Sequence, residues 1–201
     1  MIAAQAKVAA MRTSLAQRLT GFWRDRAGVS ALEFAFVLPL MLTIYIGSFE
    51  LSQGLSAKTK VSQTARTVTD LVARSTTITA SQMSDIFSAT NTVMSPFTIT
   101  TAQFVLVVST INIDANSNTT IGASCASDGN TYYTPGQTVT VPAALIVPSS
   151  QLIWGTASYT YTPFLVRGGA PFYTMVGPVT LADQMYMAPR MSPTVSLPSP
   201  C

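Results

Sequence analysis

The chain has 201 residues, of which 48% are hydrophobic and 9% are charged, whereas about 25% of the residues in an ordinary soluble domain are charged. It contains no histidine, which removes the commonest general base and the usual zinc ligand. The net charge is +3, and a surface so poor in charge argues against a nucleic-acid-binding protein.

Residues 1–28 carry the positive charge of the chain. They hold five basic residues against one acidic residue, a net charge of +4, whereas the remainder holds six basic and seven acidic residues, a net charge of −1. Positive charge beside a hydrophobic span marks the cytoplasmic side of a membrane. We therefore predict that residues 1–28 are a cytoplasmic leader, either a plain basic region or an amphipathic helix on an anionic membrane surface.

An apolar helix is predicted directly after this leader. Residues 34–49 contain no charge, but 16 residues reach only about 24 Å at 1.5 Å per residue, short of a hydrocarbon core of about 30 Å. Counted from Val29, the run reaches about 31 Å, which is enough to span. We predict a transmembrane helix over 29–50, with the N-terminus in the cytoplasm and everything after about Glu50 outside.

The longer span places Glu33 at or inside the membrane boundary, where a carboxylate needs a partner. If a peptidase cuts after Gly28, the new α-amino group belongs to Val29, and Glu33 lies one helical turn away on the same face. The carboxylate then has three candidate partners: its own N-terminus, the unpaired amides of the first turn, or the amine of an adjacent subunit. The last would set the register between packed helices.

Two alternatives remain for this stretch. In a signal anchor, Glu33 would reach the cytoplasmic interface and do nothing else. A secretory signal peptide would end in small residues at alternate positions, but the best match is Gly54–Ala57, where Leu55 is unsuitable.

Pro39 lies inside the span and removes one backbone amide, so we predict a kink there. The kink would serve either membrane exit and filament packing or no particular role, since prolines are frequent in membrane helices.

The helix is predicted to continue outside the membrane over 51–75, to about Arg74. Small and apolar residues recur at alternating spacings of four and three and form one seam. The seam would pack on the protein's own sheet, contact neighbouring helices, or divide these roles between its two halves. Its members are Gly47, Leu51, Gly54, Lys58, Val61, Ala65, Val68 and Val72.

Residues 76–201 are predicted to form one compact α+β domain in which an antiparallel, meandering sheet packs against the long helix. Met83, Ile86 and Phe87 indicate a short helix before Pro96. β-Branched and alternating runs predict five strands, over 97–113, 119–125, 138–141, 152–161 and 179–187. Within the last strand, Asp183 interrupts the apolar alternation.

The segment from Asp114 to Asn118 is similar to the opening of a calcium loop. The sixth position is Thr119, where such a loop needs glycine, and the twelfth is Cys125, where it needs glutamate. We therefore predict a hairpin turn and no metal site.

Cys125 and Cys201 are the only cysteines. With the predicted topology both lie in an oxidising compartment, where a disulfide is the economical interpretation. It would hold the Pro/Ser-rich C-terminal tail against the sheet.

Catalysis has little support in the sequence. Without histidine, the Ser-His and Cys-His arrangements are unavailable, and the carboxylates beyond the span are few and scattered. A carboxylate pair could still assemble in the folded chain, but we predict no enzyme and no cofactor.

Two motifs carry a family resemblance. Gly28 followed by Val-Ser-Ala-Leu-Glu-Phe and then Ala-Phe-Val-Leu-Pro-Leu resembles the TadE-like pilus-assembly proteins, minor pseudopilins of the tight-adherence (Flp) branch of type IV pili. The closing pattern agrees over Tyr159–Pro163, Gly177–Leu181 and Tyr186–Arg190. The chain lacks the Asp-x-Ser-x-Ser motif of the longer TadG-like relatives. Residues 76–150 carry no such signature.

The resemblance implies cleavage after Gly28 by a prepilin peptidase, a single-pass location in the bacterial inner membrane with a periplasmic domain, and a role in pilus assembly without catalysis. The implied partners are the peptidase, other pilins or pseudopilins and the assembly platform, and incorporation into the extracellular pilus is a further expectation. The alternative is an uncleaved, membrane-anchored periplasmic binding or scaffold protein. The position at the tip, base or shaft of a pilus does not follow from the sequence.

Overall fold

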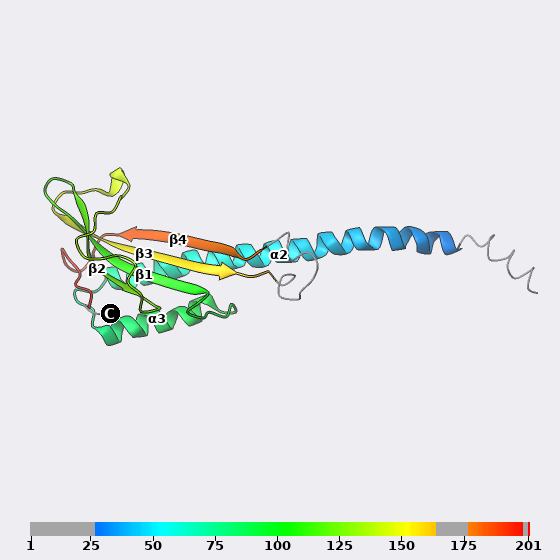
Figure 1. Cartoon of the computed structure of the whole chain (residues 1–201), viewed down its shortest axis with the longest axis horizontal. Helices are drawn as coiled ribbons and strands as arrows, with labels where there is room; N and C mark the ends of the chain where they lie inside the picture. The colour runs from blue at the N-terminus through cyan, green and yellow to red at the C-terminus, as the bar shows by residue number, and fades with distance from the viewer. Residues whose placement is uncertain (1–26, 164–176, 199–200) are drawn as a thin grey trace, which may run out of the picture. The chain divides into compact units, whose positions relative to one another are not determined.

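The computed structural model describes residues 27–163, 177–198 and 201 (Figure 1). The predictions for the leader up to residue 26 lie outside the described residues. The elements in order are α2 (Ala27–Ala73), α3 (Ala80–Met94), β1 (Phe104–Ile113), β2 (Thr119–Ala126), the short 3-10 helix η1 (Ala143–Leu145), β3 (Ser150–Tyr161) and β4 (Val179–Met187). The chain divides into two compact units, residues 1–49 and 50–201.

Helix α2 ends at Ala73, within one residue of the predicted end. In the second unit its apolar seam is buried against the sheet: Val61 and Val72 are fully buried, and Ala65 and Val68 are almost so. Leu51, by contrast, is 66% exposed. The C-terminal part of the seam therefore packs on the protein's own domain, whereas contact of the N-terminal part with neighbouring helices stays a prediction.

Helix α3 confirms the short helix predicted before Pro96. A capping box starts it: the Gln82 amide donates to the Thr79 hydroxyl over 3.3 Å, and the Thr79 amide donates to the Gln82 side-chain oxygen over 2.9 Å. These two bonds satisfy amides that the first turn would otherwise leave unpaired. Met83 and Met94 anchor the helix in the core, and a cis peptide bond joins Ser95 to Pro96.

The four strands form one antiparallel sheet in the order β2-β1-β3-β4, which confirms the α+β fold with a long N-terminal helix (Figure 1). The order is not a simple meander. The β2–β3 connection is long enough for β3 to pair with β1 instead of β2, and part of the connection covers the outer edge of β2. There the Val139 amide donates to the Thr119 carbonyl over 3.2 Å.

Two predicted strands differ from the structure. Over 138–141 there is only an isolated bridge between Thr120 and Thr138. The first strand begins at Phe104 and not at residue 97, because the backbone turns just before it, where the Phe104 amide donates to the Thr100 carbonyl over 2.9 Å. Phe97 and Ile99 pack on the core from this loop, so their apolar character reflects burial and not strand pairing.

The two faces of the sheet have separate cores. The face toward the helices carries Leu106, Val108, Ile153 and Ala157, which pack with the buried residues of α2 and α3. The opposite face carries a smaller cluster around Ile111, Ile121 and Leu152. Here Trp154 and Tyr186 are cross-strand partners with parallel rings 5.8 Å apart, and Tyr133 packs on Trp154 at 4.8 Å.

Helix α2 approaches the sheet most closely at Gly155. A Cβ atom at this position would overlap the hydroxyl oxygen of Thr69 and would lie 3.4 Å from the carbonyl oxygen of Ala65. Thr69 is fully buried, and its hydroxyl donates to that same carbonyl over 2.6 Å. The backbone of Gly155 is not in the left-handed region that favours glycine. The glycine is therefore needed because a side chain would not fit between the strand and the helix.

Residues 188–198, which we call the strap, run from the end of β4 to the segment between α2 and α3. The strap buries Val195 and Leu197 in the main core. Ser196 pairs with the segment between α2 and α3, donating to the Thr76 carbonyl over 3.0 Å and accepting from the Ile78 amide over 2.9 Å. The Val195 amide also donates to the Gln151 side chain over 2.6 Å.

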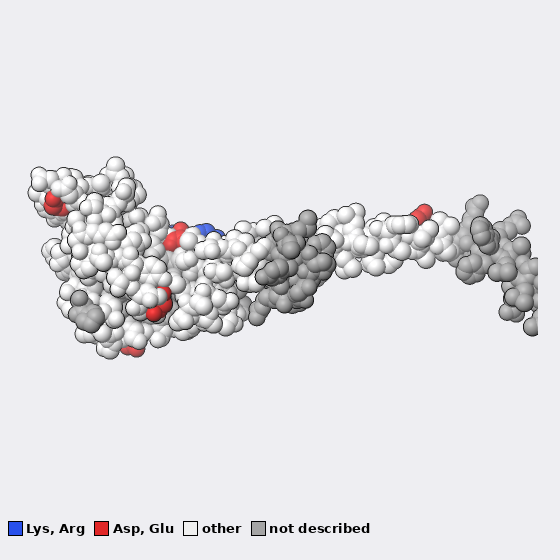
Figure 2. All heavy atoms as spheres, viewed as in Figure 1, with Lys and Arg blue, Asp and Glu red and all other residues white. Residues whose placement is uncertain are grey.

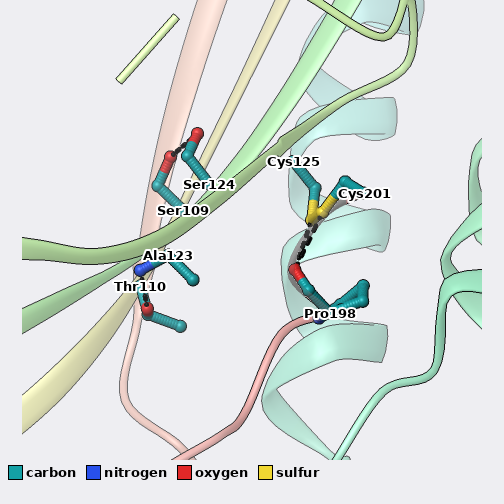
Figure 3. The surroundings of a disulfide bond; sticks show 7 residues. All are labelled: Ser109, Thr110, Ala123, Ser124, Cys125, Pro198 and Cys201. Carbon is teal, nitrogen blue, oxygen red and sulfur yellow. Dashed lines mark hydrogen bonds between the residues drawn. A yellow bond between two sulfur atoms is a disulfide. The ribbon is translucent and has the colours of Figure 1, made fainter. Parts of the chain in front are cut away.

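Cys201, beyond the strap, forms the predicted disulfide with Cys125 on β2 (Figure 3). The two Cα atoms are 5.4 Å apart, within the usual range for a disulfide. The bond links residues 76 positions apart in the sequence and so closes a loop that contains β3, β4 and the strap.

The segment after β1 is the predicted hairpin turn. Both oxygens of the Asp114 carboxylate accept hydrogen bonds from within the turn, from the amides of Asn116 and Asn118 at 2.8 Å and from the Asn118 side chain at 2.7 Å. These bonds, that from the Asn118 side chain first, lower the pKa of Asp114.

Candidate functional site: the N-terminal apolar helix

The first half of α2 is apolar on every side. Between residues 28 and 49 the large hydrophobic side chains are exposed, from Leu38 at 40% to Phe36 at 74%, except for the half-buried Ile46. The helix from Gly28 to Ala73 is long and apolar enough to cross a membrane, and none of its most apolar window is buried within the chain. An isolated helix that is hydrophobic all round needs an apolar environment, which a bilayer or packed partner helices supply.

Glu33 is the one charged residue between positions 28 and 49. It is exposed on α2, four residues after Val29, so the helix holds these two residues one turn apart on one face. Figure 2 shows how little charge there is on the face in view. No ion pair of Glu33 occurs within the ranges that the structure covers.

Gly28 lies inside α2, in open space. A Cβ atom there would meet no atom within 4 Å, and its φ does not require glycine. The same is true of Gly47. Residues 27–163, 177–198 and 201 therefore give no structural reason for a glycine at position 28.

Helix α2 continues through Pro39. The hydroxyl of Thr43 donates to the Pro39 carbonyl over 2.8 Å, and one turn later the hydroxyl of Ser48 donates to the Ile44 carbonyl over 2.8 Å. Hydroxyls bonded in this way need no outside partner, which makes them tolerable in hydrocarbon. The kink at Pro39 stays a prediction.

The segment with these features matches a family model. The match covers residues 28–70 and is to the TadE-like proteins. We call residues 28–70 the TadE-like segment. Neither the comparison with curated proteins nor that with solved structures found a match to the chain. The match confirms the resemblance to the TadE-like proteins, and it begins at Gly28, the predicted cleavage position.

The TadE-like segment contacts the sheet at Glu50, directly after its largely apolar residues 28–49. The Tyr161 hydroxyl, at the end of β3, donates to the Glu50 carboxylate over 3.1 Å. Burial, together with the charge of Glu50, raises the pKa of Tyr161 to about 12. Tyr161 therefore remains a neutral donor throughout the physiological range.

A second polar contact joins the TadE-like segment to β4. The Lys58 ammonium donates to the Ala182 carbonyl over 2.5 Å. Asp183, next along the strand, has its pKa lowered first by a hydrogen bond from Ser62 and further by the charges of Lys58 and Arg66. The carboxylate that interrupts the apolar alternation of β4 is thus paired with the polar edge of the helix.

The third contact lies at the end of the segment. Asp70 forms ion pairs with Arg74 at 2.7 Å and with Arg190 at 3.1 Å, and the Arg190 amide donates to the Ala73 carbonyl over 2.8 Å. Arg190 therefore occupies the C-terminal end of α2, where carbonyl groups lack partners within the helix.

Of the sequence-predicted site residues, α2 carries Gly28, Val29, Glu33 and Pro39, and the disulfide joins Cys125 to Cys201 in the separate second unit. Sequence reasoning missed the contacts of Glu50, Lys58 and Asp70. Apart from the ion pair between Asp70 and Arg74, each joins residues more than 100 positions apart. The closing pattern drew attention to two of the distant partners, Tyr161 and Arg190.

Proposed function

We propose that the protein is a minor pseudopilin of a tight-adherence pilus system, processed after Gly28 by a prepilin peptidase and acting in pilus assembly without catalysis. Its apolar helix anchors it in the inner membrane, with the leader in the cytoplasm and residues 50–201 in the periplasm. Its partners are the peptidase, other pilins or pseudopilins and the assembly platform.

One observation carries this proposal. The TadE-like match starts at Gly28, and from there to Phe49 the helix carries a single charged group, a carboxylate in the fifth position after the glycine. In low dielectric, an amine one turn away neutralises that carboxylate far more strongly than it would in water. Cleavage after Gly28 creates such an amine at Val29, whereas an uncleaved chain has only a neutral peptide group there.

The first experiment compares the N-terminal sequence and intact mass of the protein from membranes with and without active peptidase. The proposal predicts a peptidase-dependent chain that starts at Val29. A persistent Met1 terminus beside an active peptidase would contradict it and would support the alternative, an uncleaved and membrane-anchored binding or scaffold protein.

Gly28→Leu tests recognition of the cleavage site, with Gly47→Leu as the matched control. Both glycines have room for a side chain and lie in the same helix, so neither change should disturb folding. We expect loss of the Val29 terminus in the first variant only. Normal processing of Gly28→Leu would show that the peptidase does not read this position.

Glu33→Ala tests assembly, with Asp85→Asn as a control that removes an exposed carboxylate from α3. We expect Glu33→Ala to insert into the membrane normally and to reduce the number of pili, while the control leaves it unchanged. Full piliation with Glu33→Ala would count against a role for this carboxylate between subunits.

A further inference from the structure

The two halves of the disulfide lie in different environments. Cys125 is on β2 and is 1% exposed, in the core between the sheet and the helices. Cys201 is exposed. A thiol approaching from solvent therefore meets Cys201 before Cys125.

The attachment of the chain around Cys201 also differs from that of Cys125. The strap is fixed as far as Leu197 by core burial and by the backbone pairing of Ser196. Within the described ranges, Cys201 itself is held by the disulfide and lies 3.2 Å from the Pro198 carbonyl oxygen (Figure 3). Cys125, by contrast, is paired on β2 with Val108 of β1. Movement of Cys201 breaks few contacts, whereas movement of Cys125 opens the sheet.

Two cavities flank Cys201. One, of about 480 Å³, lies between α3 and β1 and has Met83, Phe87 and Phe104 in its wall. The other, of about 330 Å³, lies beside β2 and has Tyr133 in its wall. Cys201 lines both, and every lining residue of either cavity is uncharged. An uncharged peptide segment can therefore lie beside Cys201.

We propose that Cys201 is the exchange residue of this disulfide, at which a thiol–disulfide exchange protein forms a mixed disulfide, and that Cys125 is the resolving residue. The location of that protein in the periplasm rests on the proposed function. The assignment of the two cysteines rests only on their burial and attachment.

Bond formation proceeds in two exchange steps. The Cys201 thiolate attacks the disulfide of the oxidised partner, a Cys201–partner bond forms, and one partner sulfur leaves as a thiolate. The Cys125 thiolate then attacks the Cys201 sulfur, the protein disulfide forms, and the second partner sulfur leaves, so that the partner ends as a dithiol. The cysteine pair loses two electrons and the partner gains them. Reduction runs through the same mixed disulfide in reverse.

The first test compares Cys125→Ser with Cys201→Ser in the full-length chain in detergent, using 5,5′-dithiobis(2-nitrobenzoate) as the probe. We expect the free Cys201 of the first variant to react like an exposed thiol. The free Cys125 of the second should react at least about tenfold more slowly, because its exposure needs a local opening. Equal rates in folded variants would overturn the proposal.

The second test uses the wild-type chain, so it decides the matter if either variant unfolds. The oxidised protein is treated with limiting reduced glutathione and quenched with iodoacetamide in denaturant, so that buried thiols are also alkylated, and the adducts are located by peptide mass. Glutathione should lie on Cys201 and the alkyl group on Cys125. Glutathione on Cys125, an equal division, or no adduct would overturn the proposal. Neither test needs pilus machinery, so failure here leaves the peptidase experiment unaffected.

Discussion

Replacement of Gly155 by alanine tests how tightly helix α2 is packed on the sheet. The new methyl group would overlap the Thr69 hydroxyl and lie 3.3 Å from Thr69 Cβ. The hydroxyl cannot turn away without losing its 2.6 Å bond to the Ala65 carbonyl. Overpacking costs about 1 to 3 kcal/mol and a lost hydrogen bond about 1 kcal/mol, so we expect the free energy of unfolding to fall by about 2 to 4 kcal/mol. For a unit of this size the midpoint of thermal unfolding should fall by about 4 to 16 °C.

Gly54→Ala, on helix α2, is the control for Gly155→Ala on strand β3. Its added methyl group would lie 3.8 Å from the nearest atom, on Tyr161, an ordinary contact. Because alanine is favoured over glycine in a helix by about 1 kcal/mol, this variant should be as stable as the wild type or more so. The assay is denaturant unfolding of the full-length chain in detergent, followed by circular dichroism.

A double-mutant cycle completes the test. Thr69→Ala removes the clashing oxygen, so Gly155→Ala should cost less in that background than in the wild type. If Gly155→Ala changes stability by less than about 0.5 kcal/mol, or if its cost is the same in both backgrounds, the close approach at this point is refuted.

Two further predictions concern pH. The pKa of Tyr161 is raised from 10.0 to about 12, so the native state binds more protons than the unfolded state in this range, and stability should fall as the pH rises from about 10 to 12. The slope should be smaller in Tyr161→Phe by thermal unfolding, and equal slopes would contradict the raised pKa of Tyr161. The pKa of Asp183 is lowered from 3.8, so its contribution is present above that value and is lost as the pH falls through the folded-state pKa. Urea midpoints of Asp183→Asn and wild type should therefore differ at pH 7 and converge at low pH, and a constant gap would contradict the hydrogen bond from Ser62.

The elements that sequence predicted well have local, periodic signals. The seam from Val61 to Val72 repeats at helical spacing, so the end of α2 was predicted within one residue. The turn at Asp114, predicted because the segment departs from a calcium loop at Thr119 and Cys125, is also local, since the Asp114 side chain bonds the backbone within the turn. The disulfide could be predicted because there are only two cysteines, although their proximity could not.

The order of the strands and the polar contacts of α2 had no such signal. The pairing of β3 with β1 depends on where the long β2–β3 connection folds back, which no repeat encodes. The bond between Tyr161 and Glu50 joins residues 111 positions apart. The strand predicted from residue 97 illustrates the opposite error, because Phe97 and Ile99 are apolar for burial in the core and not for pairing.

The contact of Lys58 with β4 bears on how copies of the protein meet one another. β4 is the last strand of the sheet, and an edge strand with free carbonyl groups invites strand addition by another chain. Lys58 occupies the Ala182 carbonyl, and the neighbouring Asp183 places a charge where an added strand would have to dehydrate it. Lys58 and Asp183 thus guard this stretch of the edge against open-ended sheet growth between copies of the chain.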